Sequence, residues 1–86
     1  MSKYNPLCNY LKSSDLKVVI LEFEEIEEIL GFVLPTSAYK YEWWWANEDV
    51  NTTNHSHCKS WQSAGYKVDG VDFFLNRIVT FVKVLN

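Results

Sequence analysis

The chain has 86 residues and a formal net charge of −3, and 48% of its residues are hydrophobic and 16% aromatic. This length fits a single domain over residues 1–86, and the aromatic content excludes a disordered tail. The longest uninterrupted apolar runs, 18–21 and 43–46, fall far short of the ~20 residues that a membrane-spanning helix needs.

The start of the chain predicts a short helix and then a strand. Asn5 and Pro6 are typical of a helix start, with asparagine as the cap and proline at the first helical position. The polar run 13–15 ends this helix. Residues 17–23 are mostly apolar and β-branched, which favours a strand.

Two more helices are predicted after this strand. Residues 24–30 carry apolar side chains at helical spacing, and Gly31 is free to take the left-handed conformation that ends a helix. Pro35 and the two polar residues behind it open a third helix that runs to about Asn47. The sequence leaves open which of the three tryptophans at 43–45 is buried, because adjacent helical residues point about 100° apart.

The second half of the chain predicts a fourth helix and a C-terminal β-hairpin. Ser56 is placed to cap a helix that Gly65 ends, and residues 66–72 and 77–85 are predicted strands joined by a short turn. A helix, a strand, a helix pair and a hairpin follow one another in a winged helix-turn-helix. We therefore predict an α+β, winged-helix-like domain with three to four short helices on a small antiparallel sheet. The fourth helix departs from that order, and a plain α+β domain is the alternative.

Several short motifs are spread over nearly the whole chain. They are FEEIEEILG at 23–31, LPxSA at 34–38, WWxN at 44–47, HS at 55–56, AGYxV at 64–68 and VD at 71–72. In this combination the chain resembles a small uncharacterised family of bacterial and phage domains. The resemblance supports the fold prediction and implies no established activity.

An aromatic and polar set predicts a binding pocket. Tryptophan and tyrosine rings offer flat faces with one polar handle, and an asparagine amide can recognise the edge of a base. The first hypothesis is therefore a non-enzymatic domain that binds nucleic acid or a nucleotide through a Trp-rich surface. The alternative is that the rings fill the core and the polar residues fix helix ends and the loop. The predicted ligand-binding residues are Tyr41, Trp44, Trp45, Asn47, His55, Ser56 and Trp61, and the predicted nucleic-acid contacts are Lys40, Lys59, Lys67 and Arg77.

An acidic run at the start of the predicted second helix points to a different partner. Its carboxylates would repel the phosphate backbone, and the predicted third helix lacks a basic footprint. The second hypothesis is a small acidic protein, phage-encoded as the resemblance implies, that docks on the basic surface of a nucleic-acid-binding enzyme of host defence, of the CRISPR or restriction type. A solvated helix face is the alternative. The predicted docking residues are Glu22, Glu24, Glu25 and Glu28.

His55, His57 and Cys58 are residue types found in metal sites and in nucleophilic catalysis. A zinc site needs three or four protein ligands, and the sequence has neither a C-x₂-C nor an H-E-x-x-H spacing. Closeness in sequence does not build a catalytic triad, because triads are assembled in space. We predict ordinary loop and helix-start residues here, with no metal, no cofactor and no enzymatic activity.

The cysteines and the N-terminal segment bear on the compartment. Cys8 and Cys58 do not make a disulfide framework, and residues 1–15 lack the apolar stretch of a secretory signal. We expect a cytoplasmic protein with reduced thiols, in the host cytoplasm if a phage encodes it, and no membrane partner. An exposed tryptophan patch would also suit a homodimer interface.

Overall fold

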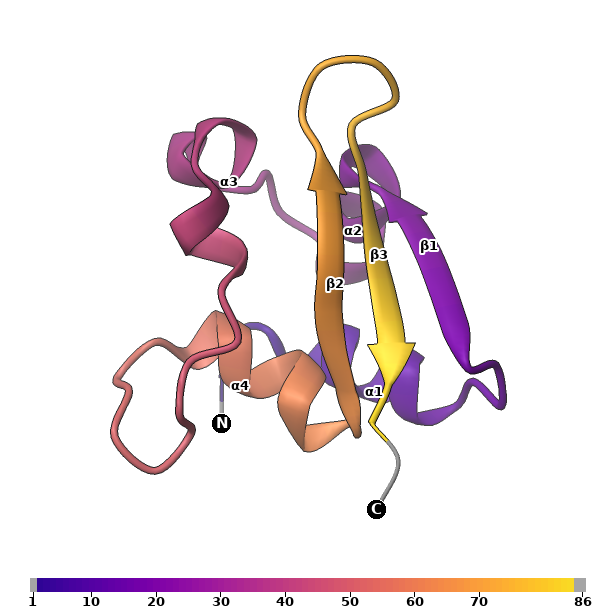
Figure 1. Ribbon diagram of the computed structural model, residues 1–86, viewed down its shortest axis with the longest axis vertical. Coiled ribbons are helices and arrows are strands. Elements are labelled where there is room, and N and C mark those ends of the chain that lie inside the picture. The colour runs from indigo at the N-terminus through magenta and orange to yellow at the C-terminus, as the bar shows by residue number, and fades with distance from the viewer. Residues whose placement is uncertain (1, 85–86) are drawn as a thin grey trace.

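A three-stranded antiparallel sheet carries the helices of this chain on one of its faces in the computed structural model, which describes residues 2–84 (Figure 1). The strands β1 (Val18–Glu22), β2 (Tyr66–Asp72) and β3 (Ile78–Lys83) lie in the order β1-β3-β2. The helices are α1 (Asn5–Lys12), α2 (Phe23–Leu30), α3 (Thr36–Lys40), the 3₁₀ turn η1 (Glu42–Trp45) and α4 (Ser56–Ser63). The α+β class and the C-terminal hairpin are thereby confirmed. Within residues 2–84, no helix has the length and apolar character that a membrane crossing requires.

The two faces of the sheet have different surroundings. Val19 and Leu21 of β1 pair with Phe81 and Val79 of β3, and all four side chains are buried against the helices. The alternate residues of the same strands point away from the helices, because successive side chains of a strand lie on opposite faces. The helical layer therefore covers one face only, and the other face is open.

Stacked aromatic rings fill the core between the sheet and the helices. The rings of Phe23 and Trp45 stack at 5.5 Å between centroids, and those of Trp45 and Trp61 stack at 5.8 Å. The Trp61 ring in turn lies 5.9 Å from the ring of Phe81 on the central strand. Each large ring removes roughly 150–250 Å² from water, which allows a short chain to bury enough apolar surface for a stable core.

The predicted third helix is wrong in one respect, because it is two shorter pieces. Tyr41 separates α3 from η1 with extended backbone angles, φ −124° and ψ 129°. A continuous helix would turn one of two adjacent tryptophans toward solvent, whereas this break re-aims the chain so that Trp44 and Trp45 both enter the core. Trp43 is the one that stays exposed.

The helix ends agree only in part with the predicted caps. Gly31 ends α2 in the left-handed conformation, with φ 83°, as predicted. Asn5 and Ser56, by contrast, are the first residues of their helices and not the caps. Neither helix has a side-chain cap, and the Thr53 hydroxyl, three positions before α4, accepts the N–H of the N-cap residue His55 at 3.0 Å. The predicted strand 77–85 is shorter, and its residue 85 lies outside the described residues.

Candidate binding surfaces

Three of the predicted ligand-binding rings belong to the core. Trp44, Trp45 and Trp61 are buried, and two of them also donate hydrogen bonds inside the domain. The indole N–H of Trp45 donates to the carbonyl of Ala38 at 2.8 Å, and that of Trp61 donates to the side-chain oxygen of Asn47 at 2.9 Å. These rings cannot offer a free face to a ligand while the domain stays folded.

Asn47 is occupied by the backbone of β2. Its side-chain oxygen accepts the N–H of Val68 at 2.9 Å, and its side-chain nitrogen donates to the Val68 carbonyl at 2.8 Å. The amide thus takes the place of a neighbouring strand at the outer edge of β2, next to the irregularity between Val68 and Gly70. Together with the bond from Trp61, this contact fixes the loop after η1 to both the sheet and α4.

Tyr41 is the predicted ring that does reach the surface, and its partner is Trp43. The two exposed rings stack at 5.7 Å between centroids and 15° between planes. Lys40 precedes them directly and is exposed. The two stacked rings lie on the surface of the domain, at the break between α3 and η1.

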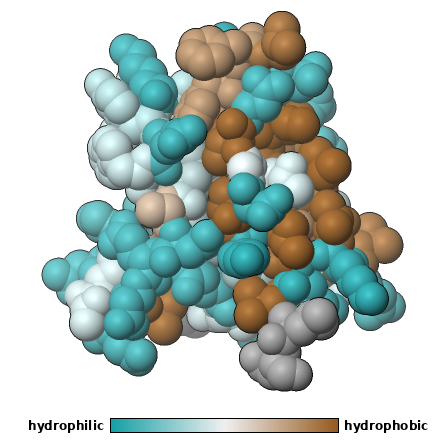
Figure 2. All heavy atoms as spheres, viewed as in Figure 1, coloured by the Kyte–Doolittle hydropathy of each residue, from teal (hydrophilic) through white to brown (hydrophobic). Residues whose placement is uncertain are grey.

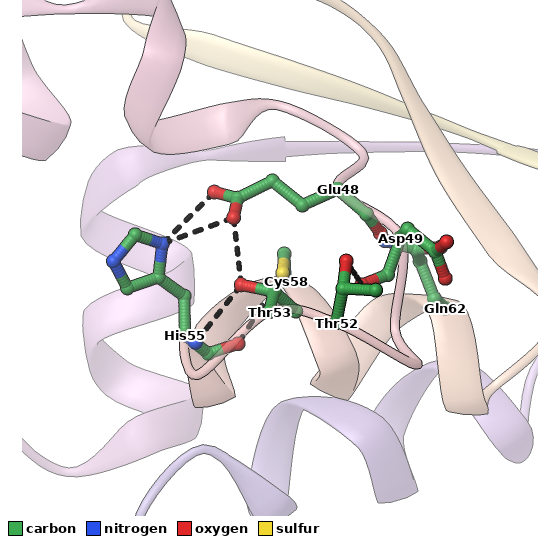
Figure 3. Close-up of polar contacts among 7 residues, drawn as sticks. All are labelled: Glu48, Asp49, Thr52, Thr53, His55, Cys58 and Gln62. Carbon is green, nitrogen blue, oxygen red and sulfur yellow. Dashed lines mark hydrogen bonds and ion pairs between the residues drawn. The ribbon is translucent and has the colours of Figure 1, made fainter.

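The loop between η1 and α4 is closed by a carboxylate clasp (Figure 3). Glu48 accepts a hydrogen bond from the Thr53 hydroxyl at 2.6 Å, and its other oxygen lies 2.9 Å from Nδ1 of His55. These two contacts, the Thr53 bond foremost, hold the pKa of Glu48 below its ordinary value. The side chain of Gln62 donates to the Glu48 carbonyl at 2.7 Å, which ties the clasp to α4.

Cys58 lies under this clasp in a setting that keeps its thiol protonated. Burial, followed by the negative charge of Glu48, raises the pKa of the thiol, and Sγ donates to the His55 carbonyl at 3.3 Å. A catalytic cysteine needs the opposite shift, because the thiolate is the nucleophile. Among residues 2–84, no three His, Cys, Asp or Glu side chains come together as a set that could hold a metal ion.

His57 is buried against the aromatic core instead of pointing into a polar site. Its ring stacks on Trp44 at 4.0 Å between centroids and 6° between planes, and the edge of the Tyr4 ring meets it as well. In the described part of the chain its Nε2 has no hydrogen-bond partner. Burial is the main cause that lowers the pKa of this imidazole below 6.5, so it is neutral at pH 7.

We expect the stability of the domain to fall as the pH drops through the range in which His57 titrates. At pH values between the lowered pKa of His57 in the folded state and its ordinary value of 6.5, the unfolded chain binds a proton that the folded chain does not. The free energy of unfolding is then highest above pH 6.5 and decreases toward the folded-state pKa. Urea denaturation of the wild type and of His57→Phe, between about pH 7.5 and about pH 5, measures this slope. The variant keeps a ring against Trp44 and is expected to lose the slope, and an unchanged slope would contradict the assignment.

The predicted nucleic-acid contacts do not converge on one surface. Lys67 lies at the beginning of β2, and Arg77 lies directly before β3, so the two are at opposite ends of the hairpin strands. The guanidinium of Arg77 lies over the ring of Tyr39, 5.8 Å from its centroid. Lys59 is on α4 and Lys40 at the end of α3, which separates the four basic residues further.

The four predicted docking glutamates, in contrast, share one region. Glu24, Glu25 and Glu28 are exposed on the side of α2 that faces away from the core, and Glu22 is exposed at the end of β1. Within residues 2–84, the single ion pair is the one between Glu48 and His55, so these four carboxylates have no cationic partner there. Two of them also have a local role, because Glu22 and Glu25 form a capping box at the start of α2, in which the Glu25 carboxylate accepts the N–H of Glu22 at 2.9 Å. The four residues are called the acidic face below.

The fifth glutamate of the run, Glu27, is structural. One of its oxygens accepts the N–H of Leu34 at 2.8 Å and the hydroxyl of Tyr39 at 2.7 Å. Burial of Tyr39, and next this hydrogen bond, raises the pKa of the phenol to about 12. Glu27 therefore fastens the turn between α2 and α3 and does not contribute to the acidic face.

An apolar hairpin tip lies beside the acidic face. Phe74 is 92% exposed and Leu75 86% exposed, and we call these two residues the hairpin tip. The carboxylate of Asp72 accepts the N–H groups of both at 3.1 Å, which lowers the pKa of Asp72 and orders the loop. Glu22 and Glu24 line a shallow cleft together with Leu75, so the tip adjoins the acidic face there. Arg77 lines the same cleft, with its guanidinium over the ring of Tyr39. The sequence predicts a turn here but not the exposed tip, although an Asp two positions before the first of two apolar turn residues is a usable signal.

The comparisons with known proteins agree with a small uncharacterised domain. A family model described as "Domain of unknown function (DUF7662)" matches residues 4–84, so the chain belongs to this family. No curated protein and no solved structure matches the chain.

Proposed function

We propose that this DUF7662 member is a non-enzymatic domain that docks on a basic protein surface through its acidic face and hairpin tip. The observation that carries the proposal is the unpaired state of four exposed carboxylates beside two apolar side chains on an ordered loop. Exposed apolar side chains of this size cost solubility and add nothing to the core. Their position next to a single-sign charge cluster favours a binding role.

The two parts of this surface would contribute differently to binding. The carboxylates raise the rate of encounter with a positively charged partner and orient it, an effect that salt weakens. Phe74 and Leu75 would supply the affinity, because large apolar side chains at the centre of an interface carry much of the binding energy. The bonds from Asp72 hold the loop in place before binding, which lowers the entropy lost on association.

The chemistry of the surface suggests what the partner looks like. A row of carboxylates resembles a row of phosphates in charge, and a groove that holds nucleic acid is lined with lysine and arginine. We therefore propose the basic groove of a nucleic-acid-binding protein as the partner. Duplex DNA added in excess should then compete with this domain for the same groove.

Charge reversal on the acidic face is expected to abolish capture of such a partner. The test is a pull-down from the cells that encode the chain, with immobilised wild type, the docking variant Glu24→Lys/Glu28→Lys and the control Asp15→Lys/Glu42→Lys. Both variants change the net charge equally, and all four positions are exposed. We expect the wild type and the control to retain a basic protein that excess duplex DNA displaces, and the docking variant to lose it at least ~10-fold. Equal retention of the basic protein by the wild type and both variants would contradict the proposal.

Binding of nucleic acid or a nucleotide is a second candidate, favoured by the stacked Tyr41–Trp43 pair beside Lys40. Base stacking on such a pair is worth about 1–3 kcal/mol per base and requires little positive charge. The element order and the sheet order β1-β3-β2 also support a winged-helix-like arrangement, with the hairpin tip in the place of the wing. Tryptophan fluorescence during titration with a single-stranded oligonucleotide separates the two candidates. A saturable change that is lost in Trp43→Ala favours this second candidate, and a flat response favours protein docking.

A further inference from the structure

The open face of the sheet is an apolar part of the described surface that the proposed function does not explain. Val18 and Ile20 of β1 are about half exposed, and Ile78 and Val82 of β3 are partly exposed beside them. The pairing places Val18 next to Val82 and Ile20 next to Thr80, so these side chains form a continuous surface. Figure 2 shows hydrophobic atoms gathered over these strands.

The centre of this face is open as well as apolar. Gly70 of β2 pairs with Thr80 in the middle row, and a side-chain carbon added at Gly70 would meet no atom within 4 Å. The helices pack on the opposite face. When two sheets pack face to face, their apolar faces lie about 10 Å apart. A three-stranded sheet with one uncovered apolar face can supply one of the two faces.

The charges at the rim of the face indicate what would cover it. Lys67 lies at the beginning of β2, opposite Val82, and Asp72 lies at the end of the same strand, opposite Ile78. A two-fold axis in the plane of the face and across the strands exchanges the two ends of every strand. It would bring Lys67 of one copy over Asp72 of the other, Val82 over Ile78, and Ile20 and Thr80 each over its own counterpart. The operation sets one charged residue, Glu22, over an apolar residue. Glu22 lies at the outer edge of the face, where its carboxylate reaches solvent.

We propose that this open sheet face binds a second copy of the chain, as a two-fold symmetric dimer in which each strand lies antiparallel over the same strand of the other copy. The face is self-complementary in charge under that axis, which is the property that an isologous interface requires. A two-fold axis along the strands would instead place Asp72 over Glu22 of the other copy, and these two carboxylates would repel each other. The dimer includes Glu22 at its edge and Asp72 at its rim, and it leaves Glu24, Glu25, Glu28 and the hairpin tip outside the interface. Its test, the oligomeric state, is separate from the test of the proposed function.

The size of the face sets the expected affinity. Three strands at a spacing of about 4.8 Å and six residues at a rise of about 3.4 Å cover roughly 300 Å² per copy. That is well below the ~800 Å² per partner of a standard stable interface. We therefore expect a reversible dimer with a Kd on the order of 10–100 µM, populated at high concentration and lost on dilution.

Sedimentation velocity of the purified chain from about 5 µM to about 1 mM tests the proposal. The wild type is expected to pass from monomer to dimer over this range. Thr80→Arg places a charge at the centre of the face, on the strand that is not an edge, and is expected to raise the Kd at least ~10-fold. Val33→Arg adds the same charge at an exposed valine outside the face and is expected to dimerise like the wild type. Ile20→Lys, on the same face, replaces Thr80→Arg if circular dichroism shows that Thr80→Arg does not fold.

Two results would overturn the proposal. A wild type that stays monomeric up to 1 mM (an upper limit about ten-fold above the weakest expected Kd) shows that a second copy does not cover the face. A dimer that survives Thr80→Arg uses another surface, such as the free edge of β1. If the wild type dimerises through this face, raising the salt concentration is expected to weaken the dimer, because salt screens the Lys67–Asp72 pairs at its rim.

Discussion

Replacement of Trp61 by alanine is expected to have the largest effect on stability, a loss of about 3–5 kcal/mol. Trp61 is fully buried between the ring of Trp45 and the ring of Phe81, and its N–H is paired with Asn47. Truncation of a buried tryptophan costs about 3–5 kcal/mol, since the cavity cannot fully collapse. A domain of this length has a free energy of unfolding of roughly 4–13 kcal/mol, so the substitution removes a large fraction of the stability.

Denaturation by urea, followed by far-ultraviolet circular dichroism, measures this loss. Trp43→Ala is the matched control, because it removes the same side chain from an exposed position and is expected to change the stability by less than about 0.5 kcal/mol. If Trp61→Ala unfolded within about 1 kcal/mol of the wild type, the stacked core would not be the main source of stability.

Replacement of Asn47 by leucine is expected to have the second-largest effect on stability, a loss of about 2–3 kcal/mol. Leucine has a similar size but leaves the buried N–H of Trp61 without an acceptor and removes both bonds to the backbone of Val68. The penalty arises from the unpaired groups and not from lost apolar contact.

The control for this second prediction is Asn54→Leu, an exposed asparagine in the same loop region. Its replacement is expected to be nearly neutral. Hydrogen exchange of the Val68 amide adds a local measurement, because that N–H is bonded to Asn47 and should exchange much faster in Asn47→Leu. A Val68 amide that stays equally protected would show that the pairing at the edge of β2 does not depend on Asn47.

The sequence predicted the local elements better than the contacts between them. Gly31 and the period of the apolar residues in 24–30 depend on local conformation alone, and the structure has both as predicted. The burial of Trp44 and Trp45 together depends on the break at Tyr41, which no local pattern indicates. Asn47 was interpreted as a residue that recognises the edge of a base, and the edge that it recognises in the structure is the peptide group of Val68. The amide chemistry was predictable, but its partner 21 positions away was not.

For the candidate surfaces too, the local patterns were predictable from the sequence and the contacts between elements were not. Grouping of the glutamates was visible in the sequence because they fall within one helical stretch, but Glu27 differs from its neighbours only through bonds to Leu34 and Tyr39. The exposure of Phe74 and Leu75 runs against the usual tendency of apolar residues, so a sequence pattern would place them inside. The open sheet face requires the strand pairing, which brings the two ends of the chain together.

The position of β3 in the middle of the sheet has a consequence for synthesis on the ribosome. β1 and β2 each pair only with β3, and β3 is made after both of them. β1 therefore stays unpaired, with Val19 and Leu21 uncovered, until residues 78–83 have left the exit tunnel. Closing such a long loop before any sheet forms slows folding. The domain is thus expected to fold as one unit only after β3 has been made, because β3 completes the sheet.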